Sequence, residues 1–172
     1  MSSDSLIERL TPRAAVVARP SVDNDTAYGT DMFAEMHAAL NLQRWAVHGA
    51  KTRGEAAPAR LTVRDMLELA TVRGAWNAAL SHKIGTLTPG KDADVIMLRT
   101  DTINVMPLNN AAGAVVTLMD TSNVDTVFIA GKLMKRNGQL VGVDLAKIRR
   151  EVEAARLAVL TRAGVKPNRL GV

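Results

Sequence analysis

Two groups of residues in this sequence have side chains suited to catalysis or metal binding. The first is Asp23-Asn24-Asp25-Thr26, in a polar loop near the N-terminus, and the second consists of His37, His48 and His82. Taken alone, Asp23 is best explained as an Asx-turn or N-cap acid, because aspartate in polar loops commonly bonds the local backbone. A catalytic zinc needs about three protein ligands, and no two of the histidines form a closely spaced pair. The chain contains no cysteine, which excludes disulfides, thiolate metal sites and cysteine nucleophiles.

The composition predicts a globular protein with an aliphatic core. Hydrophobic residues make up 47% of the chain but aromatic residues only 3%, so Leu, Val, Ile, Ala and Met must fill the interior. No stretch approaches the ~18 uninterrupted apolar residues of a membrane-spanning helix. The segment from Met1 to Arg19 lacks the apolar run of a signal peptide. We therefore expect a cytoplasmic protein with no membrane partner.

Basic residues are concentrated near the C-terminus. Residues 1–131 contain 12 Lys and Arg against 14 Asp and Glu, whereas residues 132–172 contain 10 against 3. A basic segment of this kind can bind nucleic acid. Here the charges are dispersed along an expected helix, and no aromatic side chain in the segment is available to stack on bases. We therefore expect a solvated helix face and no nucleic-acid partner.

The first half of the chain is expected to be mainly helical. A short helix over 5–10 and a buried strand over 14–18 precede the polar loop that holds Asp23. Thr30 has the residue type of an N-cap, and the apolar spacing behind it predicts a helix to about Val47. A polar, mobile loop is expected over 49–60, because it contains Gly and Pro.

A second helical region is expected after this loop. Thr62 and Asp65 have the types and spacing of a capping box, which predicts a helix from there through Ala70. Gly74 marks either a close approach of two backbones or a break before a second short helix over 76–80.

The second half of the chain predicts a small β unit and a terminal helix. A buried strand is expected over 93–98, a helix or long loop over 109–119, and a second strand over 124–130. Two hairpin turns are expected, one at Gly131-Lys132 and a type I′ turn at Asn137-Gly138. The remaining expected elements are strands over 133–136 and 139–141 and a helix over 145–163, capped by Asp144, with a stripe of Ile148, Val152, Ala155 and Val159. This order of elements indicates an α/β or α+β fold.

Four segments, in this order, resemble the amidohydrolase superfamily, and most closely its cytosine deaminase, guanine deaminase, adenosylhomocysteine-type deaminase and triazine hydrolase branch. Residues 21–36 resemble the end of the eighth barrel strand and the helix after it. Residues 66–76, MLELATVRGAW, resemble the family's A-T-x-x-G-A helical segment. Residues 84–95, IGTLTPGKDADV, resemble its IGSL-x-PGK-x-ADL entry into a small β-sandwich. Residues 124–132, VDTVFIAGK, resemble its V-x-x-V-x-V-x-G-K hairpin.

The resemblance implies a specific architecture. It implies the C-terminal fragment of a (β/α)8 metal-dependent hydrolase barrel, part of a small composite β-sandwich and a terminal helix. The corresponding domains are 1–82 for the last barrel strand or strands and their helices, 83–142 for the sandwich portion, and 143–172 for the helix and tail. A whole barrel takes ~250 residues, so at most its last one or two strands fit in this chain.

The resemblance also implies a chemistry and a role for the polar loop. Members of the family activate water with one or two divalent metals, zinc or iron, and hydrolyse C–N bonds of heterocycles or amides. By position, Asp23 is implied as the catalytic carboxylate and metal ligand of the eighth strand. Asn24, Asp25 and Thr26 are implied to line the substrate pocket. The family's His-x-His pair and its further histidine ligands have no counterpart in the sequence, so we expect no metal to be bound by this chain alone.

Two functions are consistent with these observations. The chain is expected to be the C-terminal part of a deaminase-like amidohydrolase, inactive in isolation, whose partner is the missing barrel portion. Alternatively, it is a non-catalytic relative that acts as an interaction or oligomerisation module, with self-association through exposed helix faces.

Overall fold

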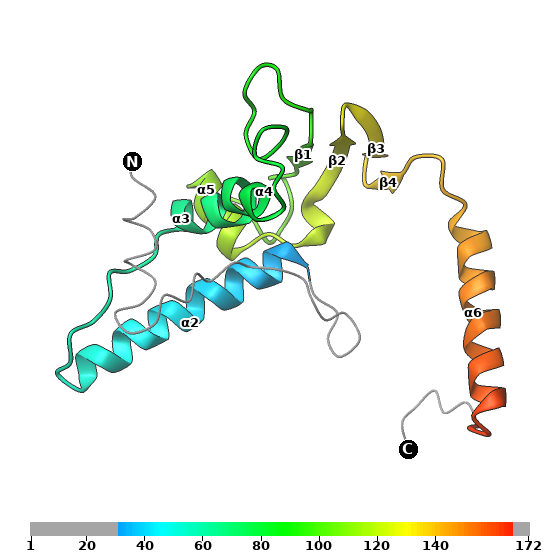
Figure 1. Cartoon of the computed structure of the whole chain (residues 1–172), viewed down its shortest axis with the longest axis horizontal. Helices are drawn as coiled ribbons and strands as arrows, with labels where there is room; N and C mark the ends of the chain where they lie inside the picture. Colours follow the sequence, from blue (N-terminus) through cyan, green and yellow to red (C-terminus); the bar gives the residue numbers. More distant parts are fainter. Residues whose placement is uncertain (1–30, 167–172) are drawn as a thin grey trace. The chain divides into compact units, whose positions relative to one another are not determined.

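The computed structural model describes residues 31–166, which form helices and one small sheet (Figure 1). The chain divides into two compact units, the first ending at Gln139 and the second beginning at Leu140. Among the described helices, none combines the length and the apolarity needed to cross a lipid bilayer. The described part is a mixed α/β fragment, in agreement with the fold class expected from the order of elements.

The longest helix of the first unit is α2, Met32–Thr52. Asp31 caps it, because its Oδ1 accepts hydrogen bonds from the backbone N–H of Phe33 at 2.8 Å and of Ala34 at 3.1 Å. The expectation that Thr30 is the cap is therefore wrong by one position. The expected end at Val47 is also too early, since the backbone stays helical through Gly49 to Thr52.

Two short helices and a π-helical segment follow. The expected capping box opens α3, Val63–Glu68: the amide of Asp65 donates to Thr62 Oγ1, and the amide of Thr62 donates to Asp65 Oδ2. The chain then continues as a π-helix, η1, Leu69–Arg73, and as α4, Gly74–Asn77. Gly74 therefore lies at a change of helix type, and the second short helix begins earlier than the expected 76–80.

The sheet has the strand order β1-β2-β3-β4. Its strands are β1 Val95–Leu98, β2 Val124–Ile129, β3 Lys132–Arg136 and β4 Gln139–Leu140, and both the β1–β2 and the β2–β3 pairs are antiparallel. The expectation that β1 is buried is wrong, because Ile96 and Met97 are exposed at the edge of the sheet.

Two tight turns connect the last three strands. Asn137 and Gly138 both have positive φ, 50° and 76°, which confirms the expected type I′ turn. The preceding turn is formed by Ala130 and Gly131, with φ of 48° and 76°, one position before the expected Gly131-Lys132. The shift arises because Lys132 already pairs with Ile129 in the ladder.

The core of the first unit lies between the helices and the segment that follows β1. It includes residues of α2, α3 and η1 and of α5, Ala111–Thr117. Its buried members are Phe33, Met36, Leu40, Leu61, Met66, Leu69, Val105, Ala114, Val116 and Met119. The aliphatic core expected from the composition is thus confirmed, with Phe33 as its one aromatic member among the described residues.

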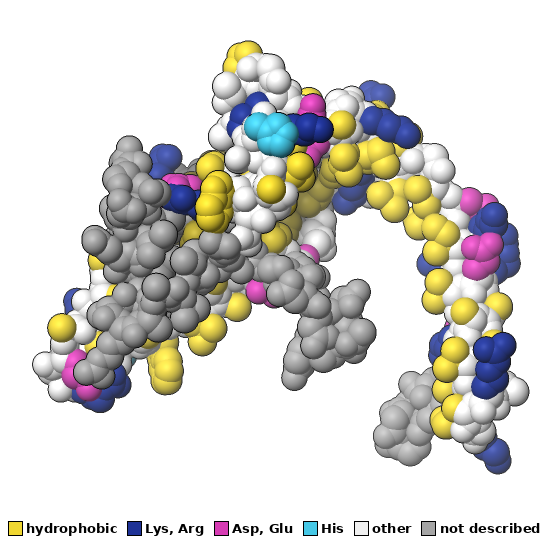
Figure 2. Space-filling model, viewed as in Figure 1, with side chains coloured by type: hydrophobic (Ala, Val, Ile, Leu, Met, Phe, Trp, Pro, Cys, Tyr) yellow, Lys and Arg dark blue, Asp and Glu magenta, His cyan; other side chains and the backbone are white. Residues whose placement is uncertain are grey.

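The described part of the second unit contains one helix, α6, Leu145–Arg162. Asp144 caps it by accepting a hydrogen bond from the amide of Lys147 at 2.9 Å, as the sequence predicts. None of its residues is buried. Figure 2 shows hydrophobic side chains gathered along one side of this helix and charged side chains along another.

Candidate functional site

The four residues predicted for the site lie outside the described part of the chain. Asp23, Asn24, Asp25 and Thr26 all precede Asp31, the first residue that the structure describes. Their predicted roles in catalysis, metal binding and substrate binding therefore stay predictions. The structure does describe α2, the helix that follows these residues in the sequence.

The three histidines do not converge. His37 and His48 lie on α2, eleven positions apart, whereas His82 lies in the turn region before β1. His48 and His82 are exposed. The Nε2 atom of His37 is buried and has no hydrogen-bond partner among the residues that the structure describes. Within residues 31–166, no three His, Asp or Glu side chains come together in a group that could hold a metal ion.

The PGK-x-AD segment, which carries the strongest resemblance, forms a local clamp. The ammonium group of Lys91 donates to the carbonyl oxygens of Ser81 at 2.6 Å and Ile84 at 3.1 Å, closing the loop that leads to β1. Asp94 Oδ1 accepts a hydrogen bond from the amide of Ala130 in the β2–β3 turn at 2.7 Å. The charged residues of this motif are thus used in backbone contacts that fix the sheet to the preceding loop.

Two other motif segments pack against each other. Gly85, with φ of 92°, lies so close to the helical segment that an added Cβ would be 2.7 Å from Ala75 Cβ and 3.3 Å from the carbonyl oxygen of Thr71. At Gly74 an added Cβ would meet nothing closer than 3.8 Å, so the close approach suggested for Gly74 belongs to Gly85 instead. The surface that Gly85 contacts is formed by Thr71 and Val72 of η1 and by Ala75 of α4.

An open, mostly apolar hollow of about 470 Å³ lies beside this contact. Thr71 and Ala75 form part of one side, Leu87 lies on the loop, and Ile96 lies on the edge strand. Among the described residues that line it, Asp94 is the one charged residue, and its carboxylate already accepts from Ala130. The described lining therefore has the chemistry of a packing surface, and its side chains do not form the convergent polar groups that orient a substrate.

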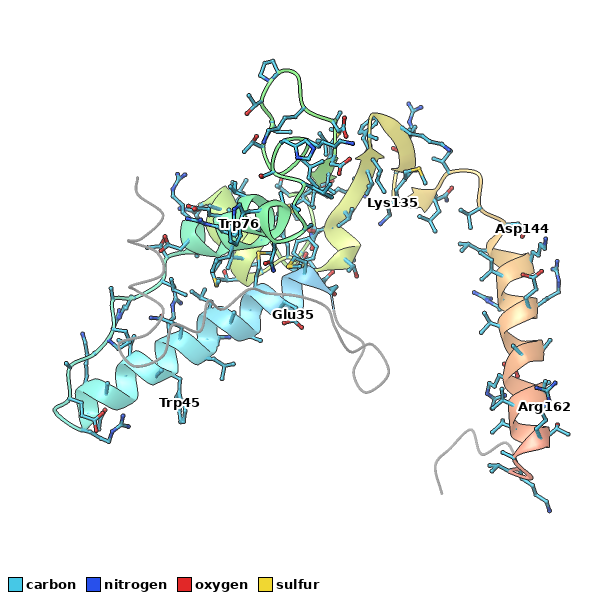
Figure 3. The ribbon with its side chains drawn as sticks, in the orientation of Figure 1. Glu35, Trp45, Trp76, Lys135, Asp144 and Arg162 are labelled. Atoms are coloured by element: carbon cyan, nitrogen blue, oxygen red, sulfur yellow. The ribbon has the colours of Figure 1, made fainter. Side chains whose placement is uncertain are left out.

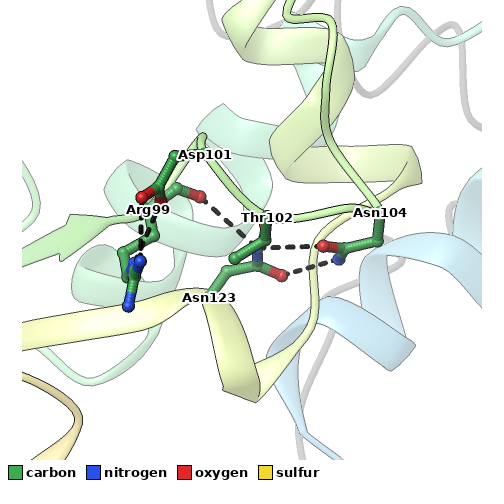
Figure 4. Close-up of polar contacts among 5 residues, drawn as sticks. All are labelled: Arg99, Asp101, Thr102, Asn104 and Asn123. Atoms are coloured by element: carbon green, nitrogen blue, oxygen red, sulfur yellow. Dashed lines mark hydrogen bonds and ion pairs between the residues drawn. The ribbon is translucent and has the colours of Figure 1, made fainter.

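A buried amide organises the polar part of the core, as Figure 4 shows. Asn123 is fully buried, and its Nδ2 donates to Thr102 Oγ1 at 2.7 Å and to the carbonyl oxygen of Arg99 at 3.3 Å. Its Oδ1 accepts from Asn104 Nδ2 at 2.9 Å and from the amide of Asp120 at 3.0 Å. The sequence analysis missed this residue, because its side-chain partners lie around twenty positions away and no local pattern marks them.

Charged groups near this cluster have shifted pKa values. Hydrogen bonds from Ser122 lower the pKa of the Asp120 carboxyl, whose Oδ1 accepts from the Ser122 amide at 2.7 Å. The Arg99 guanidinium, paired with Asp101 at 2.8 Å, lowers the pKa of the Asp101 carboxyl, mainly through their side-chain hydrogen bonds. Both carboxylates thus stay ionised as structural acceptors, which is opposite to the raised pKa that suits a general acid.

The described residues therefore have structural roles. They supply caps, a loop clamp and a satisfied polar core, and among residues 31–166 no three His, Asp or Glu side chains form a ligand group for a metal.

Comparison with known proteins gives a consistent set of relatives. A family model described as the amidohydrolase family matches residues 2–134. A 5-methylthioadenosine/S-adenosylhomocysteine deaminase of Desulfitobacterium hafniense is 32% identical over 152 residues, covering 88% of this chain and 33% of the relative. A 5′-deoxyadenosine deaminase of Methanothermobacter thermautotrophicus is 29% identical over 154 residues, covering 90% of this chain and 34% of the relative.

Solved structures show a similar fold. An adenosine deaminase from Xanthomonas campestris with bound zinc aligns with a TM-score of 0.70 at 23% identity, covering 82% of this chain and 30% of that chain. The atrazine chlorohydrolase TrzN from Arthrobacter aurescens, in complex with zinc, aligns with a TM-score of 0.51 at 21% identity, covering 67% and 25%. This chain spans about a third of the length of the curated relatives it matches.

Proposed function

Because this chain belongs to the amidohydrolase family, we propose that it is the C-terminal part of a metal-dependent hydrolase that cleaves C–N bonds other than peptide bonds, in a deaminase-like reaction. The curated relatives named above are deaminases of adenine nucleosides. Their names favour a substrate with an exocyclic amine on a nitrogen heterocycle over a simple amide. The proposed reaction is the replacement of that amine by a hydroxyl or carbonyl oxygen from water.

The proposal includes a division of the chain. Residues 1–82 would complete a (β/α)8 barrel, residues 83–142 would contribute to the small composite β-sandwich, and residues 143–172 would form the terminal helix and tail. The match to structures of zinc-containing relatives and the small antiparallel sheet of β1 to β4 support this division.

Within this division, Asp23 would be the carboxylate that this chain contributes to the active site, and Asn24, Asp25 and Thr26 would line the substrate pocket. The position of this loop directly before α2, where the family has the end of its last barrel strand, supports the assignment. The residues of the described part do not fit a zinc or iron site, because no three candidate ligands come together there. The remaining ligands would therefore come from the part of the fold that this chain does not contain.

The observation that carries the proposal is the asymmetry of coverage. The match includes 88% of this chain but only 33% of its relative. We therefore propose that the chain by itself has negligible hydrolase activity and that its partner in a working enzyme is the complementary barrel portion. A small heterocycle is the proposed substrate of that assembly.

The experiment is an activity assay on the purified chain loaded with zinc or iron. Ammonia release would be measured with 5-methylthioadenosine, cytosine and guanine, and chloride or amine release with a triazine. No turnover above the background of metal alone is expected. Substantial turnover that is lost in Asp23→Asn, but retained in the control Asp92→Asn, would overturn the proposal that this chain is inactive alone.

A second candidate function is that of a non-catalytic interaction module. The observation that favours it is the amount of exposed apolar surface, exemplified by Trp45, which is 76% exposed and points away from α2 (Figure 3). Size-exclusion chromatography with light scattering tests this function. A monomer with a single cooperative thermal transition would contradict it, because such a molecule does not require a partner.

A further inference from the structure

The terminal helix α6 has an apolar stripe with the spacing of a coiled-coil seam. Leu145, Ile148, Val152, Ala155 and Val159 follow one another at intervals of three and four, which places them at alternating a and d positions of a heptad. All five side chains are exposed, with Val152 62% exposed and Val159 63% exposed. An isolated helix of 18 residues is only marginally stable in water, so burial of this stripe against a partner would stabilise it.

The charges that flank the stripe identify the partner. With Leu145 at position a, the g positions before the first two a residues are Asp144 and Glu151, and the e positions are Arg149 and Arg156. In a parallel, in-register pair of helices, each g residue faces the e residue five positions later on the other helix. Asp144 would then face Arg149, and Glu151 would face Arg156, so all four charged contacts of a symmetric pair join opposite charges.

We propose that α6 pairs with the α6 of a second copy of this chain as a short, parallel two-stranded coiled coil. An antiparallel pair that overlaps the full stripe is disfavoured, because it would place Arg149 of each helix opposite Arg156 of the other, like charge against like charge. A partner helix without acidic residues at its g positions and basic residues at its e positions would leave some of these four charged side chains without an opposite charge. The proposal is independent of the catalytic proposal, since α6 contains none of the predicted site residues.

Contacts within the helix are compatible with this pairing. Lys147 lies 3.8 Å from Glu151, and Arg156 lies 2.9 Å from Glu153, both on the helix surface. Asp144 uses Oδ1 to cap the helix, which leaves its second carboxylate oxygen for an arginine. The seam covers two heptads and the a position of Val159. The next d position is Arg162, which ends the apolar stripe. Because the seam is short, association is expected to be weak.

The first test measures the mass of the full chain by sedimentation equilibrium from about 10 µM to about 1 mM, a range chosen for weak association. A reversible monomer–dimer equilibrium is expected. Val152→Glu should raise the dissociation constant by about tenfold or more, because it inserts a charge into the seam. Ala154→Glu adds the same charge outside the seam and should leave the constant unchanged. Circular dichroism would establish that both variants retain their helix content.

The second test uses the charge pattern. Glu151→Arg and Arg156→Glu should each weaken self-association, because each places like charges opposite one another across the seam. An equimolar mixture of the two variants should recover association, because the arginine introduced at position 151 of one chain then faces the glutamate introduced at position 156 of the other.

The third test uses the absence of cysteine from the chain. Leu145→Cys should form an interchain disulfide under mild oxidation in a parallel pair. In an antiparallel pair the two thiols would lie about 20 Å apart, too far to react.

Four outcomes would overturn the proposal. They are a monomer at every concentration, a dimer that Val152→Glu does not weaken, no recovery in the mixed charge variants, and no disulfide in a chain that does dimerise. Binding to vesicles of phosphatidylglycerol and phosphatidylcholine by a chain that stays monomeric would also overturn it, and would assign the basic helix to a lipid surface.

Discussion

Asp94 and Ala130 lie 36 positions apart in the sequence, yet Asp94 Oδ1 accepts a 2.7 Å hydrogen bond from the Ala130 amide. Asp94 directly precedes β1, and Ala130 begins the turn between β2 and β3. The contact therefore joins the entry of the sheet to its central hairpin. It gives the aspartate of the PGK-x-AD segment a structural role, because its carboxylate satisfies a backbone donor in a turn with positive φ.

Removing this carboxylate should loosen the hairpin. Asp94→Ala is expected to lower the free energy of unfolding by about 1 kcal/mol, because the Ala130 amide loses its acceptor while remaining open to water. Chemical denaturation followed by circular dichroism measures the change. Asp92→Ala is the matched control, since it removes an exposed acid of the same motif, and an equal effect of both substitutions would contradict the assignment.

The clamp formed by Lys91 is expected to hold the loop before β1. Lys91→Met retains the aliphatic stem but removes the ammonium that donates to Ser81 and Ile84, and should cost about 1–2 kcal/mol of stability. Hydrogen exchange should also become faster in the loop over 81–92. Lys83→Met, at an exposed lysine nearby, should change neither quantity, and unchanged exchange in Lys91→Met would refute the clamp.

Gly85 should tolerate no larger residue. Gly85→Ala would place a Cβ 2.7 Å from Ala75 Cβ in a backbone with φ of 92°, so the loop and the helical segment must separate or strain. A loss of about 2–3 kcal/mol is expected from overpacking and backbone strain together. Gly90→Ala has nearly the same φ, 91°, with nothing within 4 Å, and reports the backbone strain alone. Equal losses at the two positions would show that the contact with Ala75 contributes nothing.

Asn123 is expected to be the most sensitive polar residue of the first unit. Asn123→Ala would leave Asn104, Thr102 and the Asp120 amide without their buried partner, at a cost of about 2–4 kcal/mol for several unsatisfied groups. The thermal transition should also broaden, because these contacts connect three segments of the core. The exposed Asn109→Ala is the control. A Tm within a degree of the wild type for Asn123→Ala would contradict the importance of the cluster.

Stability should depend on pH through Asp120. Hydrogen bonds from Ser122 lower the pKa of this carboxyl in the folded chain, so its contribution is present above the ordinary carboxyl pKa of about 3.9 and is lost as the pH falls through the lower folded value. Asp120→Asn keeps the cap but cannot titrate. The difference in Tm between wild type and Asp120→Asn should therefore be constant from pH 7 to about pH 5 and shrink below pH 4. A difference that grows on acidification would reverse the assigned direction.

Features stabilised by contacts within a few residues could be predicted from the residue order alone. The capping box of Thr62 and Asp65, the cap at Asp144 and the type I′ turn at Asn137-Gly138 all depend on a side chain or a φ preference acting on adjacent backbone. The resemblance to the family could also be identified from the sequence, because it depends only on the types and order of the residues in the motifs. The location of the predicted site at Asp23 stays a prediction on the same basis.

Features that depend on which distant segments meet became visible only in the folded chain. Asn123 became the polar centre of the core through partners 19 to 24 positions away, and its local contact, the capping box that it forms with Asp120, does not predict that it is buried. Gly85, and not Gly74, is the point of close approach, because the position of a neighbouring backbone determines whether a Cβ fits. The exposure of Ile96 and Met97 was likewise unpredictable, since apolar side chains on an edge strand are buried only where another part of the fold covers them.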